Sequence, residues 1–266
     1  MLKKDFIPVA FDQWYLRYQK DTAGDFYRKI ASQGPRKDFR KTTQGFYIVA
    51  PDGEFFYYNN NQGPRRLRTM MKAAIREFKP RPYDPLQVKT VDKGFERRLP
   101  QGAAVVRVNA KILGGYGSTS NERKKAFQSA ISRDNLWVLA DEIKQLESGK
   151  FPPTLARRIT RFHLIDNTRG EPSMWRANEI KVSKFVINNK QVSAAIHVET
   201  ADGERGYQAQ LKGTIVVEKG KLKQFDLVAK GAAWGEGTWT KGAPLGKFTL
   251  AVAFRIADDS DIADQV

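Results

Sequence analysis

The sequence predicts an α+β protein with two domains, a small α/β domain followed by a larger antiparallel β-rich domain with two helices. Three observations lead to this prediction. Residues 42–78 read as strand, tight turn, strand and helix, and residues 78–85 contain three prolines. After residue 180, long segments of partly alternating apolar residues are separated by short turns, which is typical of an antiparallel meander.

The first domain is expected over residues 1–79 and to begin with a strand and a helix. Residues 4–11 carry apolar side chains, partly in alternation, and are expected to form a buried strand. A helix is expected to begin at Thr22, with Asp25 three residues later as in a capping box, and to end before Gly34.

A hairpin and a basic helix complete this domain. The segments 46–50 and 54–58 flank a Pro-Asp-Gly turn, in which the glycine supplies a positive φ. The helix is expected to begin at Pro64, with an apolar stripe on one side. The other side carries the candidate polyanion-binding residues Arg65, Arg66, Arg68 and Arg76.

This order of strand, helix, strand, strand and helix resembles a thioredoxin fold that lacks its first strand and first helix. The resemblance covers about the first 80 residues and is carried by the Pro-Asp-Gly hairpin and the helix that starts with proline. The chain has no cysteine, and Thr43 and Gln44 stand where the family has Thr-Pro. Because a thiolate is the nucleophile of dithiol exchange, the resemblance implies a redox-inactive domain for binding or scaffolding.

A proline-rich linker is expected over residues 80–90, followed by the β-rich domain over residues 91–266. One helix is expected between Ser132 and Gly149, and a shorter one from Pro152. Because the turns are short, neighbouring strands should pair antiparallel and form a curved sheet or a small barrel. The expected strands are residues 103–113, 180–187, 192–200, 206–218, 221–230 and 247–257.

Two segments of this domain carry candidate ligand-binding residues, HLIDNTRGEPSMW and WGEGTWTKGAPLGKF. They resemble segments of uncharacterised bacterial proteins in which such a domain follows a thioredoxin-like one, and this resemblance implies no activity. Dense polar residues and tryptophans at a barrel mouth are typical of ligand pockets. The alternative is an Asx-type turn with a structural Asp–Arg pair, and tryptophans that plug the barrel. The candidates are Asp166, Arg169, Trp175, Trp234 and Trp239.

A metal site is the second hypothesis for this domain. The chain has two histidines, His163 and His197, and the alternation of a strand places Glu199 on the same face as His197. Two histidines and one carboxylate can hold a transition metal. The alternative is that each histidine lines the barrel or is capped by a hydrogen bond.

The charge distribution suggests a third kind of site. The formal net charge is +17, and residues 1–100 hold 21 Lys/Arg against 11 Asp/Glu, whereas residues 201–266 hold nine of each. A basic surface attracts nucleic acid or acidic glycans in a salt-dependent way. Residues 36–41 would add to the arginine face of the helix that begins at Pro64. The alternative is that this charge only keeps the protein soluble.

The sequence therefore predicts a non-enzymatic protein that binds a small ligand or a protein partner, with the specific site in the β-rich domain. The alternatives are a polyanion-binding module and a metal-dependent enzyme that uses His163 and His197. The absence of cysteine excludes disulfides and zinc–thiolate sites. No apolar run reaches the roughly 18 residues of a membrane span. We expect a cytoplasmic protein, or an exported one if a leader has been removed.

Overall fold

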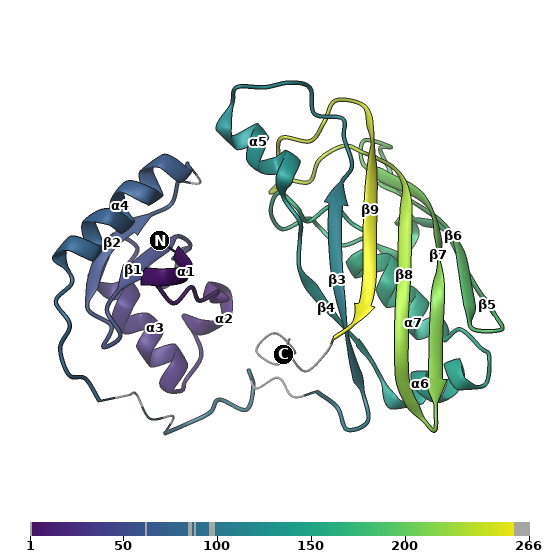
Figure 1. Ribbon diagram of the computed structural model, residues 1–266, viewed down its shortest axis with the longest axis horizontal. Helices are drawn as coiled ribbons and strands as arrows, with labels where there is room; N and C mark the ends of the chain where they lie inside the picture. The colour runs from purple at the N-terminus through teal and green to yellow at the C-terminus, as the bar shows by residue number, and fades with distance from the viewer. Residues whose placement is uncertain (1, 62, 85–86, 88, 96–98, 258–266) are drawn as a thin grey trace. The chain divides into compact units, whose positions relative to one another are not determined.

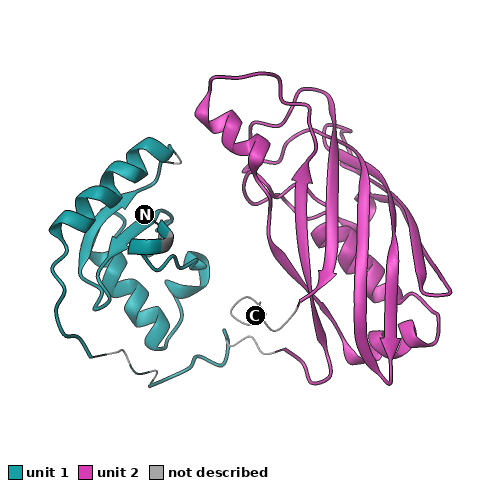
Figure 2. Ribbon diagram, in the orientation of Figure 1, with its two compact units in different colours: residues 1–97 teal, residues 98–266 magenta. Residues whose placement is uncertain are grey.

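The structure is a computed structural model that describes residues 2–61, 63–84, 87, 89–95 and 99–257 (Figure 1). The chain divides into two compact units, Met1–Arg97 and Arg98–Val266 (Figure 2). Unit 1 therefore extends beyond the boundary predicted at residue 79 and includes the predicted linker. In the described part of the chain, no helix is long and apolar enough to cross a membrane.

Unit 1 combines a two-stranded hairpin with helices. Its elements are α1 (Leu2–Asp5), α2 (Gln13–Leu16), α3 (Thr22–Gln33), β1 (Phe46–Val49), β2 (Phe55–Asn59) and α4 (Pro64–Glu77). The expected helices and hairpin are confirmed. The positive φ expected at the turn is also confirmed, because Gly53 has a φ of 85°.

The strand expected over residues 4–11 is wrong. Residues 2–5 form α1, and the rest of the segment is not in a strand. Pro8 has no N–H group for a β-ladder, and Asp12 begins a helix by accepting a hydrogen bond from the Trp14 amide at 2.9 Å. Ile7 is 89% exposed, so the apolar pattern of this segment does not mark a buried face of unit 1.

The hairpin lies between α3 and α4. Tyr47 packs against a cluster that contains Tyr27 of α3, and the next residue, Ile48, packs with Met71 of α4. Successive residues of a strand point to opposite faces, so α3 covers one face of the hairpin and α4 covers the other. Each of the two clusters has three buried residues, and unit 1 therefore has a thin core.

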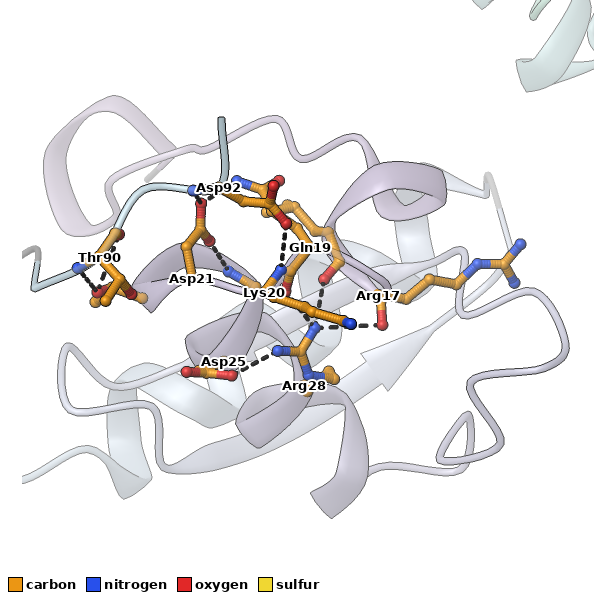
Figure 3. Close-up of polar contacts among 11 residues, drawn as sticks. Arg17, Gln19, Lys20, Asp21, Asp25, Arg28, Thr90 and Asp92 are labelled. Atoms are coloured by element: carbon orange, nitrogen blue, oxygen red, sulfur yellow. Dashed lines mark hydrogen bonds and ion pairs between the residues drawn. The ribbon is translucent and has the colours of Figure 1, made fainter. Parts of the chain in front are cut away.

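Residues 89–92, at the end of the predicted linker and just beyond it, dock onto the N-terminus of α3 (Figure 3). The Asp92 amide donates to Asp21 Oδ2 at 2.9 Å, and the Lys20 amide donates to Asp92 Oδ2 at 2.9 Å. The Thr22 hydroxyl accepts hydrogen bonds from the amides of Lys89 and Thr90. These bonds explain why unit 1 continues past residue 79.

Unit 2 is built on a seven-stranded antiparallel sheet that curls into a half-barrel (Figure 1). Its strands are β3 (Ala104–Ile112), β4 (Asp134–Val138), β5 (Ile180–Asn188), β6 (Gln191–Glu199), β7 (Gly206–Glu218), β8 (Lys221–Trp234) and β9 (Lys247–Ile256). Their order is β4-β3-β9-β8-β7-β6-β5, so β5 to β9 form the expected meander. All six expected strands are confirmed, and the sheet is curved.

The helix expected between Ser132 and Gly149 is partly wrong, because its first half is β4. Leu136 pairs with Val106 of β3 and is buried, as is Val138, so this segment follows the two-residue period of a strand. The Ser132 hydroxyl does not cap a helix but accepts a hydrogen bond from the Ala110 amide at 2.8 Å. The helix itself is α6 (Ala140–Glu147).

Helices cover one face of the sheet. The expected shorter helix is α7 (Pro153–Arg158), which continues as a π-helical turn over Ile159–His163. Leu155, Ile159 and the inward residues of the strands form one continuous core with α6. A further helix that the sequence did not predict, α5 (Glu122–Ser129), has no buried residue. We call the sheet face opposite this core the open face.

Candidate functional site

Four of the five candidate ligand-binding residues line one cavity in unit 2. Asp166, Arg169, Trp175 and Trp234 surround it, next to the start of β7 and the end of β8. Trp239 is not among the lining residues, and 75% of its surface is exposed. The sequence therefore identified residues that meet in space, although they come from segments about seventy residues apart.

Within this cavity, Asp166 and Arg169 are fully engaged with each other and with the backbone. The Thr168 amide and hydroxyl donate to Asp166 Oδ1 at 3.1 and 2.6 Å, and Arg169 Nε donates to Asp166 Oδ2 at 3.1 Å. Arg169 also donates to the Thr240 carbonyl. Its side chain is 1% exposed. This is the geometry of the structural alternative, an Asx-type turn closed by a buried ion pair.

The two tryptophans close the cavity. Trp175 Nε1 donates to the Leu164 carbonyl at 2.8 Å, and Trp234 Nε1 donates to the Gly203 carbonyl at 2.9 Å. The Arg205 guanidinium lies over the Trp175 ring at 4.1 Å. The remaining cavity has a volume of about 20 Å³, which is room for about one water molecule. These side chains therefore fill the end of the half-barrel.

The two histidines lie on opposite faces of the sheet. His163 Nδ1 is 2.8 Å from Asp134 Oδ2, and its ring packs edge-to-face against the buried Phe254. His197 lies on the open face, with Nε2 3.0 Å from Glu199 Oε2, which confirms the predicted placement of that pair. Among the described residues, no group of three or more His, Asp and Glu side chains could hold a metal ion.

The contact with His163 affects the ionisation of Asp134. Burial raises the pKa of Asp134, but the hydrogen bond and the charge of His163 hold it below its ordinary value. Only 8% of the His163 side chain is exposed. His163 is thus a core histidine oriented by one carboxylate, which is the structural alternative for this residue.

The candidate polyanion-binding residues all lie on α4. Arg65, Arg66, Arg68 and Arg76 are exposed, and Met71 and Ala74 on the same helix are buried. In the described part of the chain, Arg66, Arg68 and Arg76 form no ion pair. The segment 36–41 differs from α4, because three of its four cations have local partners. Arg36 donates to the Tyr58 hydroxyl, and Arg40 and Lys41 pair with Asp38.

The open face of the half-barrel contains a groove that sequence reasoning missed. Its volume is about 390 Å³. Strand pairing brings its polar residues together, because His197 lies opposite Gln208, and Gln210 lies between Ala195 and Lys230. The lining residues are Val182, Ala195, Ile196, His197, Gln208, Ala209, Gln210, Lys230 and Gly231. The alternation of polar residues along β7 is the sequence signal for a polar sheet face. The groove itself can be located only when the register of the neighbouring strands is known.

Comparison of the chain with protein-family models, with curated proteins and with solved structures finds no match. The resemblance of unit 1 to a thioredoxin fold and that of unit 2 to bacterial proteins therefore stay predictions. The function proposed below is therefore argued from the contacts and charges of the described residues.

Proposed function

We propose that the chain is a binding protein for polyanions, nucleic acid or acidic glycan, and that α4 makes the main electrostatic contact. One observation carries this proposal, which is the row of cations along the exposed side of α4. Arg65, Arg68, Lys72 and Arg76 follow one another at intervals of three and four residues, so they lie on the same side of the helix.

Three of the four cations of this row are available to a partner. Arg68, Lys72 and Arg76 are exposed and form no ion pair in the described part of the chain. The acidic residue of α4, Glu77, accepts a hydrogen bond from the Tyr57 hydroxyl. A helix rises about 1.5 Å per residue, so the row is roughly 16 Å long and can follow several charges of a polymer.

The charge of unit 1 as a whole supports the same partner. Residues 1–97 hold 20 Lys/Arg against 11 Asp/Glu. The polyanion would therefore be attracted over a distance set by the ionic strength, about 8 Å at physiological salt. With no cysteine in the chain, unit 1 has no thiol for exchange, and a binding role is consistent with its surface.

The other two hypotheses have less support. A cavity of about 20 Å³ at Asp166 and Arg169 is far below the roughly 300 to 1,000 Å³ of ordinary ligand pockets. Both side chains already have partners there. A metal site would require His163 and His197 to meet, and they lie on opposite faces of the sheet.

The proposal is tested by replacing Arg65, Arg66, Arg68 and Arg76 together with glutamine. Glutamine is a good helix former, so α4 should persist. We expect weaker binding to a short duplex DNA and to a heparin fragment. On DNA, the slope of log K against log salt should flatten by about 0.9 for each phosphate contact that is lost.

The control has the same change of net charge in unit 2, with glutamine at the exposed residues Lys124, Lys125, Lys150 and Lys223. We expect it to keep the salt slope of the wild type. If both variants lose the same affinity, the net charge and not α4 causes binding. If neither polymer binds the wild type at low salt, the charge serves solubility and the proposal is wrong.

A further inference from the structure

We propose a second binding site, the groove on the open face of unit 2, which takes one uronic-acid unit of an acidic glycan. The proposal extends the proposed function by naming the class of polyanion. It is carried by the residues of unit 2 alone, so it stands or fails separately from the α4 contact.

The groove has the size and the floor that a sugar ring needs. Its volume of about 390 Å³ lies within the roughly 300 to 1,000 Å³ typical of small-molecule sites. Ala195 contributes only a methyl group to the floor, and Ala209 and Gly231 contribute backbone, because Ala209 and its cross-strand partner Gly231 belong to the core face of the sheet. Polar side chains surround this floor and form the walls of the groove: Gln208, Gln210, His197 and Lys230.

The polar walls suit a ligand with several hydroxyl groups. Gln208 and Gln210 project from the same face of β7, two residues apart, and neither side chain has a hydrogen-bond partner in the described part of the chain. Each amide offers both donors and an acceptor, as vicinal hydroxyls require. His197 is fixed by Glu199 through Nε2, which leaves Nδ1 as a further polar atom.

The charge of the groove selects an anion. Lys230 lies between Gln210 and Ala251 in the strand register, and it forms no ion pair within the described residues. Lys184 lies in the same cross-strand row, opposite Ala195, and is exposed. The nearby carboxylate, Glu199, is held by His197. An ammonium group that faces water without a counter-ion can pair with the carboxylate of a sugar.

Two features favour a uronic acid over a nucleic acid. The lining residues include no Phe, Tyr or Trp side chain, and the one aromatic ring among them, the His197 imidazole, is held by Glu199 and lies 6.5 Å from the Trp234 ring, whereas recognition of single strands depends largely on bases stacked on aromatic rings. The amides of β6, β7 and β8 are engaged in the sheet, since each of these strands pairs on both sides. These three strands therefore offer the groove none of the free backbone N–H groups that usually bind a phosphate.

The test uses the full chain and a short oligogalacturonate as the probe, with a neutral oligosaccharide and an oligothymidylate for comparison. The chain has only two histidines, so the His197 ring signal in NMR spectra reports on the groove directly and is assigned with His197→Gln. We expect a saturable shift of this signal with the oligogalacturonate and none with the neutral sugar.

Variants of the exposed wall residues measure the recognition. Loss of the charged hydrogen bond in Lys230→Gln should weaken binding about tenfold, and Gln208→Ala combined with Gln210→Ala should weaken it by a similar factor. The matched control is Lys223→Gln, an exposed lysine outside the groove. It should bind like the wild type.

The outcomes separate this proposal from the α4 contact. The four-arginine variant should keep the His197 shift with the oligogalacturonate, even if it has lost heparin and DNA. An unchanged His197 signal at saturating probe would overturn the groove proposal, and so would binding that Lys230→Gln leaves unaffected. Equal competition by oligothymidylate would also overturn it, because the groove would then bind anions without regard to the sugar.

Discussion

Unit 1 and unit 2 hold their positive charge in different ways. In unit 1 five of the 20 cations lie along one helix, α4, over a thin core in which Met71 and Ala74 are the buried residues of that helix. In unit 2, Lys230 is one of several polar residues that strand pairing places around a groove, over a continuous core. The arrangement in unit 1 sets the density of positive charge along a helix, whereas the arrangement in unit 2 sets the positions of individual polar side chains. The difference suggests that unit 1 contributes attraction and unit 2 contributes selectivity.

Arg169 of unit 2 and the α4 arginines of unit 1 also differ in burial. Arg169 is buried and bound to Asp166 and to the Thr240 carbonyl, so its charge is compensated inside the protein. Arg68 and Arg76 are exposed and have no ion pair in the described part of the chain, so their charge acts outward. A buried charge must be paired, whereas an exposed one is screened by water.

The largest expected effect comes from breaking the buried pair. Asp166→Ala leaves Arg169 charged and buried, which should cost about 3–5 kcal/mol of the free energy of unfolding of unit 2. Urea unfolding followed by tryptophan fluorescence measures this cost, because four of the five tryptophans lie in unit 2. The change should leave the α4 contact intact, since Asp166 belongs to the other unit.

Two further variants sharpen this prediction. Asp166→Leu combined with Arg169→Met removes both charges, and it should recover much of the lost stability. The control Asp226→Ala removes an exposed carboxylate and should change stability by less than about 0.5 kcal/mol. If Asp166→Ala were as mild as this control, the pair would not be structural, and a ligand role for Asp166 would regain support.

A smaller effect is expected in unit 1, at the N-cap of α3. Asp21 accepts hydrogen bonds from the Gly24 and Asp92 amides, at 2.9 Å each (Figure 3). Asp21→Ala should cost unit 1 about 0.5–2 kcal/mol. It should also release residues 89–94, which limited proteolysis in this segment would detect. Asp25→Ala, on the exposed side of the same helix, is the control.

The ionisation of Asp21 gives this contact a pH dependence. Burial raises the pKa of Asp21, but the hydrogen bonds from Gly24, Asp92 and Gln19 lower it more, to below its ordinary value of 3.8. A lowered carboxyl pKa stabilises the folded state above the unfolded pKa, and this stabilisation is lost as the pH falls through the folded pKa. Protection of residues 89–94 from proteolysis by pepsin should therefore fall below about pH 3.8 in the wild type. In Asp21→Asn it should fall less steeply, and equal slopes would contradict this role.

Local signals in the sequence predicted much of the fold. The Pro-Asp-Gly turn, the helix that starts at Pro64 and the long alternating strands depend on nearby residues, and all are confirmed. The errors arose where pairing with distant strands decides whether a segment becomes a helix or a strand. Leu136 fits a helical stripe with Leu139 and Ile143, yet it pairs with Val106 of β3. Conversely, the apolar residues 6–11 do not pair as a strand.

The candidate site was predictable only in part. Four residues that line one cavity were candidates from the sequence, because polar and aromatic residues cluster in the two segments that contain them: Asp166, Arg169, Trp175 and Trp234. It could not show that these side chains fill their own cavity, since packing volume depends on all the neighbours. The open-face groove was missed, because its residues come from four strands and their alignment depends on register.

The most direct test of the division between the two units is a salt titration of oligogalacturonate binding. It compares the wild type, the four-arginine variant of α4 and Lys230→Gln. We predict that the α4 variant flattens the salt slope but still shows the His197 shift, and that Lys230→Gln weakens this shift but keeps most of the slope. If the two variants alter both measurements in the same way, the units do not play different roles and the account is contradicted.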